Sequence, residues 1–424
     1  MKSLSKLKEL ISEYCPNGVR YATLGELGYF YGGLSGKTKE DFKDGNAKFI
    51  TYMNVYTNPS LKLDVLDKVK IEENEKQNLI EYGDVLFTGS SETPDECGMS
   101  SVLTEKTLEK LYLNSFSFGY RFYDTTLFVP DFCKYLFRST ELRKQIKMTA
   151  SGVTRFNVSK KKMANIKIPI VPIELQNKIV KILDNFTELE AELEAELEAV
   201  KKQYGYYRDE LLSFKDEVKM TESLKAILSF CNVCEKNGFK VEYYELKNFA
   251  EVGTGSSNGN EAAEDGKYPF FIRSQTVKLK NDYEYDEEAI IIPGEGGIGE
   301  IYHYINGKYA LHQRVYRIHF KDTSINTRFM YYYFKAYFKE FIVQKAVSAT
   351  VQSIRKPMIE KFMIPIPPLE IQNAIVTVLD RFEKYANDLS CGLPAEIEKR
   401  KQQYEYYRDL LLKFEDISEV QTAI

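Results

Sequence analysis

The chain has 424 residues, of which 43% are hydrophobic and 28% are charged, and its formal net charge is −4. This length accommodates two to four domains, and the composition predicts that most of the chain is folded. Six cysteines exclude a disulfide framework, and three histidines disfavour a metal site or a histidine-based catalytic site. The sequence shows no run like a signal peptide or a membrane span, so we expect a reducing compartment, the cytoplasm.

The first part of the chain predicts a short helix and then a mixed, mainly β domain. Apolar residues recur at helical spacing in Leu4–Tyr14, and Cys15-Pro-Asn-Gly18 ends that helix. The segment Val19–Lys160, here called the first domain, is rich in Tyr, Phe, Gly and Asn. Its strand-like runs are Lys48–Val55, Asp84–Thr88 and Ser117–Tyr123, and one helical stretch covers Pro130–Met148.

A long amphipathic helix is predicted next, over Glu174–Phe214. Its apolar residues follow steps of four and three, which is the heptad spacing of a coiled coil, with one stutter at Leu193–Leu197. At about 1.5 Å per residue this helix is roughly 60 Å long. Its segment Asp184–Glu198 carries seven acids and no base. Such a helix needs a partner helix in water.

The second part of the chain repeats this plan. A short helix, Thr221–Cys231, precedes a second Tyr- and Phe-rich segment, Val241–Lys356, here called the second domain. Its strand-like runs are Tyr268–Ile272, Ala289–Ile292 and Val315–Phe320, and its helical stretch is Asn326–Val347. A second long heptad seam runs from Ile371 to Phe414. Four extra residues beside Leu389, together with Gly392 and Pro394, predict a kink or a broken turn there.

Two sequence blocks occur twice, and they establish the repeat. Ile168–Asp184 (IPIVPIELQNKIVKILD) returns 196 positions later as Ile364–Asp380 (IPIPPLEIQNAIVTVLD). Lys201–Phe214 returns 200 positions later as Lys401–Phe414. A repeat this long indicates two whole modules, each a variable globular part followed by a constant helical part. The segments predicted are 1–160 and 221–356 for the domains, and 161–220 and 357–424 for the helices.

Basic stretches lie at equivalent places in both modules. Lys134–Lys162 carries nine Lys or Arg against one acid, and Arg328–Lys361 carries seven against two. A single basic run usually solvates a surface. Because the pattern recurs in both modules, we interpret it as the footprint of a polyanion binder.

Several other motifs do not predict a site. Gly294–Gly299 matches GxGxxG, but the next residues alternate like a strand with a turn at Asn306-Gly307, where a dinucleotide site requires a helix. The chain has no Walker A loop, and it has no Asn-Pro-Pro-Tyr motif of an amino-methyltransferase. Pro94-Asp95 has no acid-x-Lys element at nuclease spacing. Cys231-Asn-Val-Cys234 is a lone CxxC, which we interpret as packing cysteines.

With this repeat, the chain resembles a type I restriction-modification specificity subunit. Ile168–Asn177 and Ile364–Asn373 resemble the family's IP-x-PP-LxEQ start of a conserved helix. Further resemblances to the family's variable G-x-T segment and to recurring elements of its target-recognition domains are Ser151–Thr154, Ser348–Gln352, Gly83–Phe87, Gly294–Gly296 and Leu311–Arg314.

The resemblance implies an α+β fold with two mixed, mainly β target-recognition domains, two long antiparallel coiled-coil helices and a pseudo-twofold internal repeat. Each domain would read half of a split target in double-stranded DNA. The chain itself would have no catalytic, metal or cofactor site. Two methyltransferase (modification) subunits, which methylate adenine at N6 with S-adenosylmethionine, would dock on the helices, and restriction subunits would join them. The alternatives are a coiled-coil adaptor and a fused DNA-modifying enzyme with disguised catalytic residues.

Candidate DNA-binding residues follow from their chemistry and their place in predicted loops. Basic residues leading into the long helices are candidates for phosphate contact: Arg155, Lys160, Lys161, Lys162, Arg355 and Lys356. Polar loop residues are candidates for base reading: Ser35, Lys37, Asn54, Ser90, Ser91, Thr154, Asn157, Ser256, Asn258, Arg273, Gln275, Gln313, Arg314, Thr350 and Gln352. The tyrosines of the second repeated block are expected to pack between the helices: Tyr204, Tyr207, Tyr404 and Tyr407.

Overall fold

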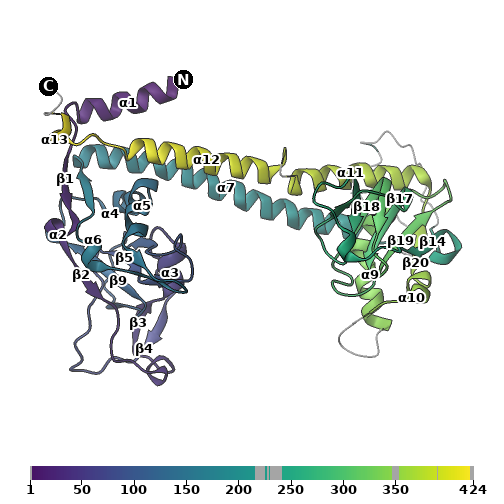
Figure 1. The fold of residues 1–424 in the computed structure, drawn as a ribbon, viewed down its shortest axis with the longest axis horizontal. Helices are drawn as coiled ribbons and strands as arrows, with labels where there is room; N and C mark the ends of the chain where they lie inside the picture. Colours follow the sequence, from purple (N-terminus) through teal and green to yellow (C-terminus); the bar gives the residue numbers. More distant parts are fainter. Residues whose placement is uncertain are drawn as a thin grey trace. The chain divides into compact units, whose positions relative to one another are not determined.

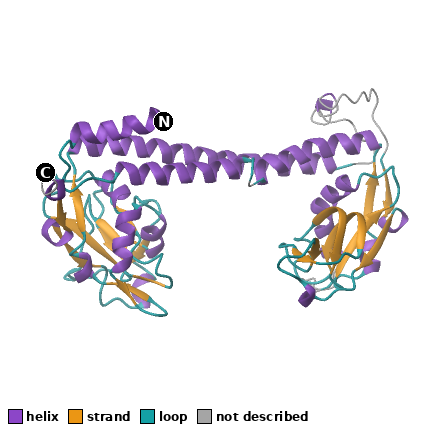
Figure 2. Cartoon of the chain, turned by 45° about the horizontal axis from the view of Figure 1, so that its top comes forward, coloured by secondary structure: helices purple, strands orange, loops and turns teal. Residues whose placement is uncertain are grey.

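The structure is a computed structural model that describes residues 2–214, 225–226, 229, 241–345, 353–388 and 390–420. Its contacts divide the chain into two compact units (Figures 1 and 2). The first unit is Met1–Leu193 with Ile397–Ile424, and the second unit is Glu194–Glu396. The first unit therefore contains the first domain, and the second unit contains the second domain.

The first unit is built from short strands and short helices around one main sheet. That sheet has the order β2 (Gly28–Gly32), β9 (Ser117–Phe122), β5 (Val85–Thr88) and β7 (Ser100–Val102). The smaller sheets are β4 (Asp67–Val69), β3 (Ala47–Ile50) and β8 (Leu111–Leu113); β10 (Ala150–Ser151), β11 (Phe156–Val158) and β6 (Ser90–Ser91); and β1 (Arg20–Thr23) with β12 (Lys167–Ile170). The helices are α1 (Lys2–Tyr14), α2 (Leu24–Leu27), η1 (Lys39–Phe42), α3 (Tyr52–Thr57), α4 (Pro130–Leu136), α5 (Thr140–Met148), α6 (Lys160–Met163) and α13 (Ile417–Val420).

The second unit has one larger sheet. Its order is β14 (Ala250–Thr254), β19 (Val315–Phe320), β17 (Tyr285–Pro293), β18 (His303–Leu311), β15 (Tyr268–Phe271) and β16 (Lys278–Lys280). A separate pair joins β13 (Glu242–Glu245) to β20 (Met363–Ile366). The helices are η2 (Leu246–Asn248), η3 (Gly259–Glu261), α9 (Thr327–Lys345) and α10 (Lys356–Glu360).

The two domains share one strand topology although their sequences barely resemble each other. The antiparallel series β2-β9-β5 corresponds to β14-β19-β17, and the parallel pair β3–β8 corresponds to β15–β18. The pair β1–β12 corresponds to β13–β20, and both β12 and β20 lead into a long helix. The repeat therefore extends through the variable parts of the chain.

The long helices follow the sequence prediction, including the predicted break. The first is α7 (Ile173–Leu212), one continuous helix of 40 residues. The second is interrupted between α11 (Leu369–Asn387) and α12 (Leu393–Leu411). At the break Gly392 approaches the preceding helix so closely that a Cβ there would lie 2.6 Å from the carbonyl oxygen of Tyr385. Glycine is therefore required at this position.

In the first unit α7 and α12 run antiparallel. Phe186 stacks on Tyr407 with ring centroids 5.3 Å apart, and further along α7 Glu190 pairs with Lys401 at 3.5 Å. Leu189 is 47% exposed, so this apolar residue of the predicted heptad pattern is not buried between the helices.

In the second unit the same pairing occurs with exchanged roles. Phe382 of α11 packs against Tyr207 of α7 at 5.9 Å, and Tyr385 donates a hydrogen bond to Glu196 at 3.0 Å. Three of the tyrosines expected between the helices are found there, because Tyr204 and Tyr207 contact Phe382 and Tyr407 contacts Phe186. The fourth, Tyr404, has its ring contact with Tyr135 of α4. The contact between a phenylalanine and a tyrosine is thus repeated in both helix pairs, whereas the polar contacts beside it differ.

A buried glutamine ties the start of each long helix to its domain. The Gln176 Oε1 accepts a hydrogen bond from the Val129 N–H at 2.8 Å, and its Nε2 donates to the carbonyls of Leu127 and Val171, both at 2.8 Å. Gln372 makes the same three contacts in the second unit, at 2.8 to 3.0 Å. Both side chains are fully buried. This glutamine clamp gives a physical reason for the repeated IPIxPxExQN block.

A repeated aspartate, eight residues and so about two helical turns further on, adds a second tie. Asp184 accepts hydrogen bonds from the Lys134 ammonium at 2.9 Å and from the Tyr135 hydroxyl. Asp380 accepts from Arg328 at 2.8 Å and from the Tyr332 hydroxyl. The helices therefore meet their domains through hydrogen bonds as well as through apolar packing.

Three local predictions differ from the structure. Lys48–Val55 is not one strand, because β3 ends at Ile50 and the hydroxyl of Thr51 caps helix α3. Pro130–Met148 is two helices, since Ser139 starts a new helix by capping α5. The expected turn at Asn306-Gly307 is absent, because β18 continues through it in pairing with β17. The predicted helix Thr221–Cys231 and the CxxC segment lie largely outside the described residues.

Candidate nucleic-acid interface

Main-chain hydrogen bonds fix the loops at one end of the first domain. The N–H of Gly89, just after β5, donates to the carbonyl of Phe116 at 2.8 Å, and the Gly89 carbonyl accepts from Val158 at 3.0 Å. Asn114 N–H donates to the carbonyl of Ile50 at 3.1 Å. These bonds bring together four loops that are distant in sequence.

The second domain has the same bonds at corresponding positions. Gly294 N–H donates to the carbonyl of Arg314 at 2.9 Å, and the Gly294 carbonyl accepts from Ile354 at 2.9 Å. His312 N–H donates to the carbonyl of Phe271 at 3.0 Å. The residues one or two positions after these bonded residues therefore correspond in the two domains. They are here called the loop triads: Tyr52, Ser90 and Phe116 in the first domain correspond to Arg273, Glu295 and Arg314 in the second domain.

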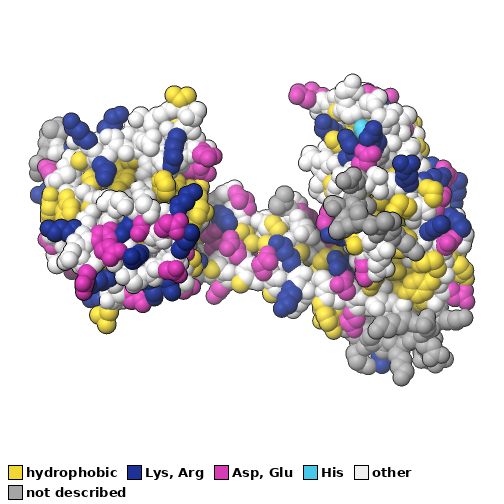
Figure 3. All heavy atoms as spheres, turned by 90° about the horizontal axis from the view of Figure 1, so that it is seen from below, with side chains coloured by type: hydrophobic (Ala, Val, Ile, Leu, Met, Phe, Trp, Pro, Cys, Tyr) yellow, Lys and Arg dark blue, Asp and Glu magenta, His cyan; other side chains and the backbone are white. Residues whose placement is uncertain are grey.

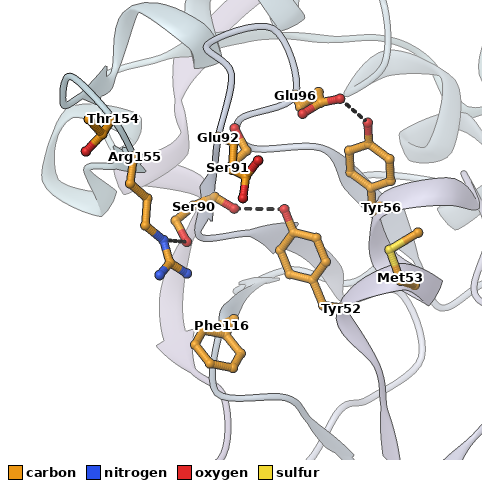
Figure 4. Close-up of a pocket in the computed structure, with 10 residues that line it drawn as sticks. All are labelled: Tyr52, Met53, Tyr56, Ser90, Ser91, Glu92, Glu96, Phe116, Thr154 and Arg155. Carbon is orange, nitrogen blue, oxygen red and sulfur yellow. Dashed lines mark hydrogen bonds between the residues drawn. The ribbon is translucent and has the colours of Figure 1, made fainter.

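The first-domain triad lies in a pocket of about 590 Å³ (Figure 4). The Tyr52 hydroxyl donates to the carbonyl of Ser90 at 2.8 Å, and Arg155 Nε donates to the Ser90 hydroxyl at 3.1 Å. The Arg155 guanidinium lies 5.8 Å from the ring centroid of Phe116. Phe116 is 59% exposed, and Met53 on the pocket rim is 57% exposed. The pocket therefore offers apolar faces and one oriented cation.

Two tyrosines form one wall of this pocket. Tyr52 stacks on Tyr56, and the Tyr56 hydroxyl donates to Glu96 at 2.9 Å. Burial raises the pKa of Tyr52, and the hydrogen bond to Glu96 raises the pKa of Tyr56. Both phenols are therefore protonated near neutral pH and act as hydrogen-bond donors.

The second-domain triad is charged. Glu295 accepts a hydrogen bond from Arg314 Nη1 at 2.7 Å and from Arg273 Nη1 at 3.3 Å. The hydrogen bond from Arg314 holds the pKa of Glu295 below its usual value. His312 Nδ1 accepts from the Arg314 N–H at 3.0 Å, and burial followed by the two arginines lowers the pKa of His312.

The two domains therefore present different chemistry on one scaffold. Figure 3 shows hydrophobic side chains on the faces of both domains, and on the second domain a histidine among basic and acidic side chains. Beside the second triad, the Gln313 amide donates to the Asn258 side chain at 2.8 Å. Guanidinium, amide, hydroxyl and apolar groups are the types that read base edges in the DNA major groove.

The predicted phosphate contacts are exposed. Lys160, Lys161 and Lys162 form the exposed start of α6, although Lys160 also lies 5.6 Å from the Phe118 ring. Arg355 and Lys356 are exposed at the start of α10, which precedes β20 as α6 precedes β12. Exposed lysines and arginines in the segment before each long helix suit contact with a phosphate backbone.

The other predicted residues divide into exposed and internally bonded ones. Asn54 is buried, and its side chain bonds to Lys62 and Val65 of its own loop, so it has no free role at the surface. Lys37 pairs with Glu75 and is 7% exposed at its side chain. The remaining predicted side chains are Ser35, Thr154, Asn157 and Gln275, which are exposed, Ser91, which is buried and donates to the Thr93 carbonyl, and Ser256, which bonds to Glu284. Thr350 and Gln352 lie outside the described residues.

Sequence reasoning missed Tyr52, Tyr56, Phe116 and Glu295, which are central to the two triads. Most aromatic residues pack in protein cores, so the residue type alone does not indicate a binding role, and an isolated glutamate carries no signal. Loops rich in Tyr and Phe between predicted strands were the available indication. Among the described residues no group of three or more His, Cys, Asp and Glu side chains could hold a metal ion. In the described part of the chain we found no helix with the length and apolarity that crossing a membrane requires.

Comparison with known proteins assigns the family. The sequence model of the type I restriction modification DNA specificity domain matches residues 16–199 and 240–399. The chain belongs to this family. It is 32% identical over 287 residues to a putative type I restriction enzyme specificity subunit of Haemophilus influenzae, covering 62% of this chain and 68% of that protein. A putative type I specificity subunit of Mycoplasma pneumoniae is 31% identical, over 59% of this chain and 94% of its own length.

Solved structures agree in fold. The specificity subunit of Mycoplasma genitalium has a TM-score of 0.51 at 13% identity, covering 93% of this chain and 96% of its own. A chain from a structural study of assembly and conformational transition of the type I system has a TM-score of 0.58 at 16% identity, covering 94% and 98%. The predicted family, its specificity-subunit role and the α+β fold class are confirmed.

Proposed function

We propose that this specificity subunit reads double-stranded DNA without catalysing a reaction, and that each domain binds one half of a bipartite, asymmetric target. The observation that carries this is the pair of loop triads. The same main-chain hydrogen bonds hold both triads, whereas the side chains are Tyr, Ser and Phe in one domain and Arg, Glu and Arg in the other. A scaffold kept twice with different polar and apolar groups suits two readers of different base sequences.

The helical segments 161–220 and 357–424 are proposed to separate the domains 1–160 and 221–356 and to dock two methyltransferase subunits. In support, Tyr206 and Tyr406 occupy equivalent places in the repeat and are 65% and 55% exposed. Exposed tyrosines are enriched where proteins bind each other, and two equivalent ones suit two copies of one partner. Methylation of adenine at N6 with S-adenosylmethionine would then belong to those partners, and restriction subunits would join the complex in the cytoplasm.

Salt-dependent binding of duplex DNA tests this proposal. Five exposed basic residues precede the long helices: Lys160, Lys161, Lys162, Arg355 and Lys356. If each neutralises a phosphate, the plot of log K against log salt concentration falls with a slope of about −4 to −5. A coiled-coil adaptor without DNA contacts would show no such slope. The matched measurement incubates the pure chain with DNA, Mg²⁺ and S-adenosylmethionine, where methylation or cleavage would support the fused-enzyme alternative.

Exchange of one domain tests the modular reading. Replacing Val19–Lys160 by the corresponding segment of another specificity subunit should change one half of the recognised sequence and leave the other half as it was. Methylated adenines mapped in a host that carries the hybrid would report both halves. A change in both halves would contradict independent reading.

A further inference from the structure

We infer that the second domain specifies guanine through Arg273 and Arg314, and that Glu295 is the residue that positions both guanidinium groups. This inference rests on the proposed DNA-reading function and adds the base that one half of the target must contain. The first domain, which has Tyr52 and Phe116 at the corresponding positions, selects its own half of the target by different contacts.

The backbone brings the two arginines together. β15 and β18 run parallel, with Phe271 paired to Leu311, so both strands end at the same edge of the sheet. Arg273 and Arg314 follow these ends by two and three residues. Glu295 follows β17 and reaches both arginines, at 3.3 Å and 2.7 Å.

The geometry leaves part of each guanidinium available. The contacts with Glu295 use Nη1 of both arginines, and among the described residues no hydrogen bond joins Nε or Nη2 of either arginine to another group. The side chains are 45% exposed for Arg273 and 56% exposed for Arg314. A guanidinium held on one edge presents its remaining N–H donors in a fixed direction. Guanine offers O6 and N7 as adjacent acceptors in the major groove, and arginine is their commonest partner.

A simpler interpretation is an ordinary surface ion pair, and the first domain argues against it. Surface ion pairs contribute little to stability, so folding gives little reason to keep this one. The first domain forms the same main-chain hydrogen bonds with uncharged Tyr52, Ser90 and Phe116 in these places. The charged triad is therefore dispensable for the scaffold, and its chemistry is explained by what the loops bind.

The side chains of the first-domain triad suit a different base from the one that the second-domain triad contacts. The first-domain triad presents aromatic faces, and its nearby cation, Arg155, is held by Ser90 and lies over Phe116. Apolar groups contact the methyl group of thymine, whereas arginine pairs contact guanine. Different bases at corresponding positions of the two halves follow from this difference.

Selection from a randomised DNA library tests the inference with the full chain. The wild-type protein should enrich guanine at a fixed position in one half of the target, and Arg314→Ala should reduce that preference about 5- to 150-fold, the effect of one lost bidentate contact. Arg355→Ala is the matched control in the same domain, because loss of a phosphate contact should weaken binding to all sequences alike. Enriched guanine that survives both Arg273→Ala and Arg314→Ala would overturn the inference.

Glu295→Gln separates positioning from mere charge. Removing this carboxylate should lower the preference for guanine and at the same time raise the affinity for unrelated duplexes, because a negative charge near the phosphates is lost. Glu295→Asp should restore part of the preference. A Glu295→Gln protein with unchanged guanine preference would exclude a positioning role.

The outcomes also separate this inference from the proposed function. Salt-dependent binding without any guanine position in either half would overturn the inference and leave DNA reading intact. If the wild-type chain bound no duplex, both would fail. Retained salt-dependent binding by Arg314→Ala shows that the variant is folded.

Discussion

Replacing the clamp glutamine Gln176 by leucine tests how the domain and the long helix are joined. Leucine has a similar volume but no hydrogen-bonding group, so three backbone groups lose their partner: the N–H of Val129 and the carbonyls of Leu127 and Val171. The glutamine is fully buried, so water does not reach these groups without local opening. An unsatisfied buried group costs about 1 kcal/mol or more, so three cost about 3 kcal/mol.

Hydrogen exchange is the suitable assay, because a chain with two units has no single free energy of unfolding. A loss of about 3 kcal/mol corresponds to about 100-fold faster exchange where the first unit opens. The amides of β12 and α4 should show it, and those of the second unit should not. Gln372→Leu should produce the mirror result in the second unit.

Gln203→Leu supplies the control, since Gln203 is exposed on the same helix, α7. It should leave exchange nearly unchanged. The reasoning is refuted if Gln176→Leu accelerates exchange no more than Gln203→Leu does. It is also refuted if the acceleration is equal in both units, because the clamp would then not be local.

Three further predictions concern the second unit and the helix break. Phe382→Ala and Tyr207→Ala should couple by about 0.5–1.5 kcal/mol in a double-mutant cycle measured by unfolding of the second unit, whereas additive effects would show that the rings do not interact. The pKa of His312 is lowered in the folded chain, whereas in the unfolded chain it has its ordinary value of about 6.5. Below that pH the unfolded chain therefore binds the proton more readily than the folded chain does. The stability of the second unit should therefore fall as the pH drops from 7 to 5, and His312→Asn should reduce that slope; an unchanged slope would rule out His312 as its source. Deleting residues 388–391 should change the helix pair and the spacing between the two recognised half-sites, as read from methylated genomic sites, and an unchanged spacing would show that it is set elsewhere.

The long helices could be predicted from the sequence because their signals are local and repeated. A heptad seam specifies which residues face a partner helix, and Gly392 with its four extra neighbours indicated where the second helix breaks. The repeated block around Gln176 and Gln372 was recognised, but its role as a clamp was not. That role depends on backbone N–H and carbonyl groups in a loop 46 to 49 residues away, and sequence periodicity carries no information on such distant partners.

The candidate site was harder to predict for the same reason. Asn54 looked like a polar loop residue, but the cap formed by Thr51 turns the chain into α3 and buries the asparagine within its own loop. Tyr52, which lies in the predicted strand Lys48–Val55, is brought to the pocket by the same turn. The arginines Arg273 and Arg314 were selected, although their shared contact with Glu295 follows only from the parallel pairing of β15 and β18.

The loop triads also explain how the two domains can differ so much in sequence and still share a fold. The bonds that hold Gly89 and Gly294 in their loops join main-chain atoms only, and these are indifferent to the side chains that the loops carry. A different side chain at the position of Ser90 or Glu295 therefore removes none of these bonds. The constraint falls instead on residues whose side chains bond to the backbone, such as Gln176 and Gln372, which are identical in both copies. A protein built this way can acquire a new target by changing exposed loop residues while the helices and clamps stay as they are.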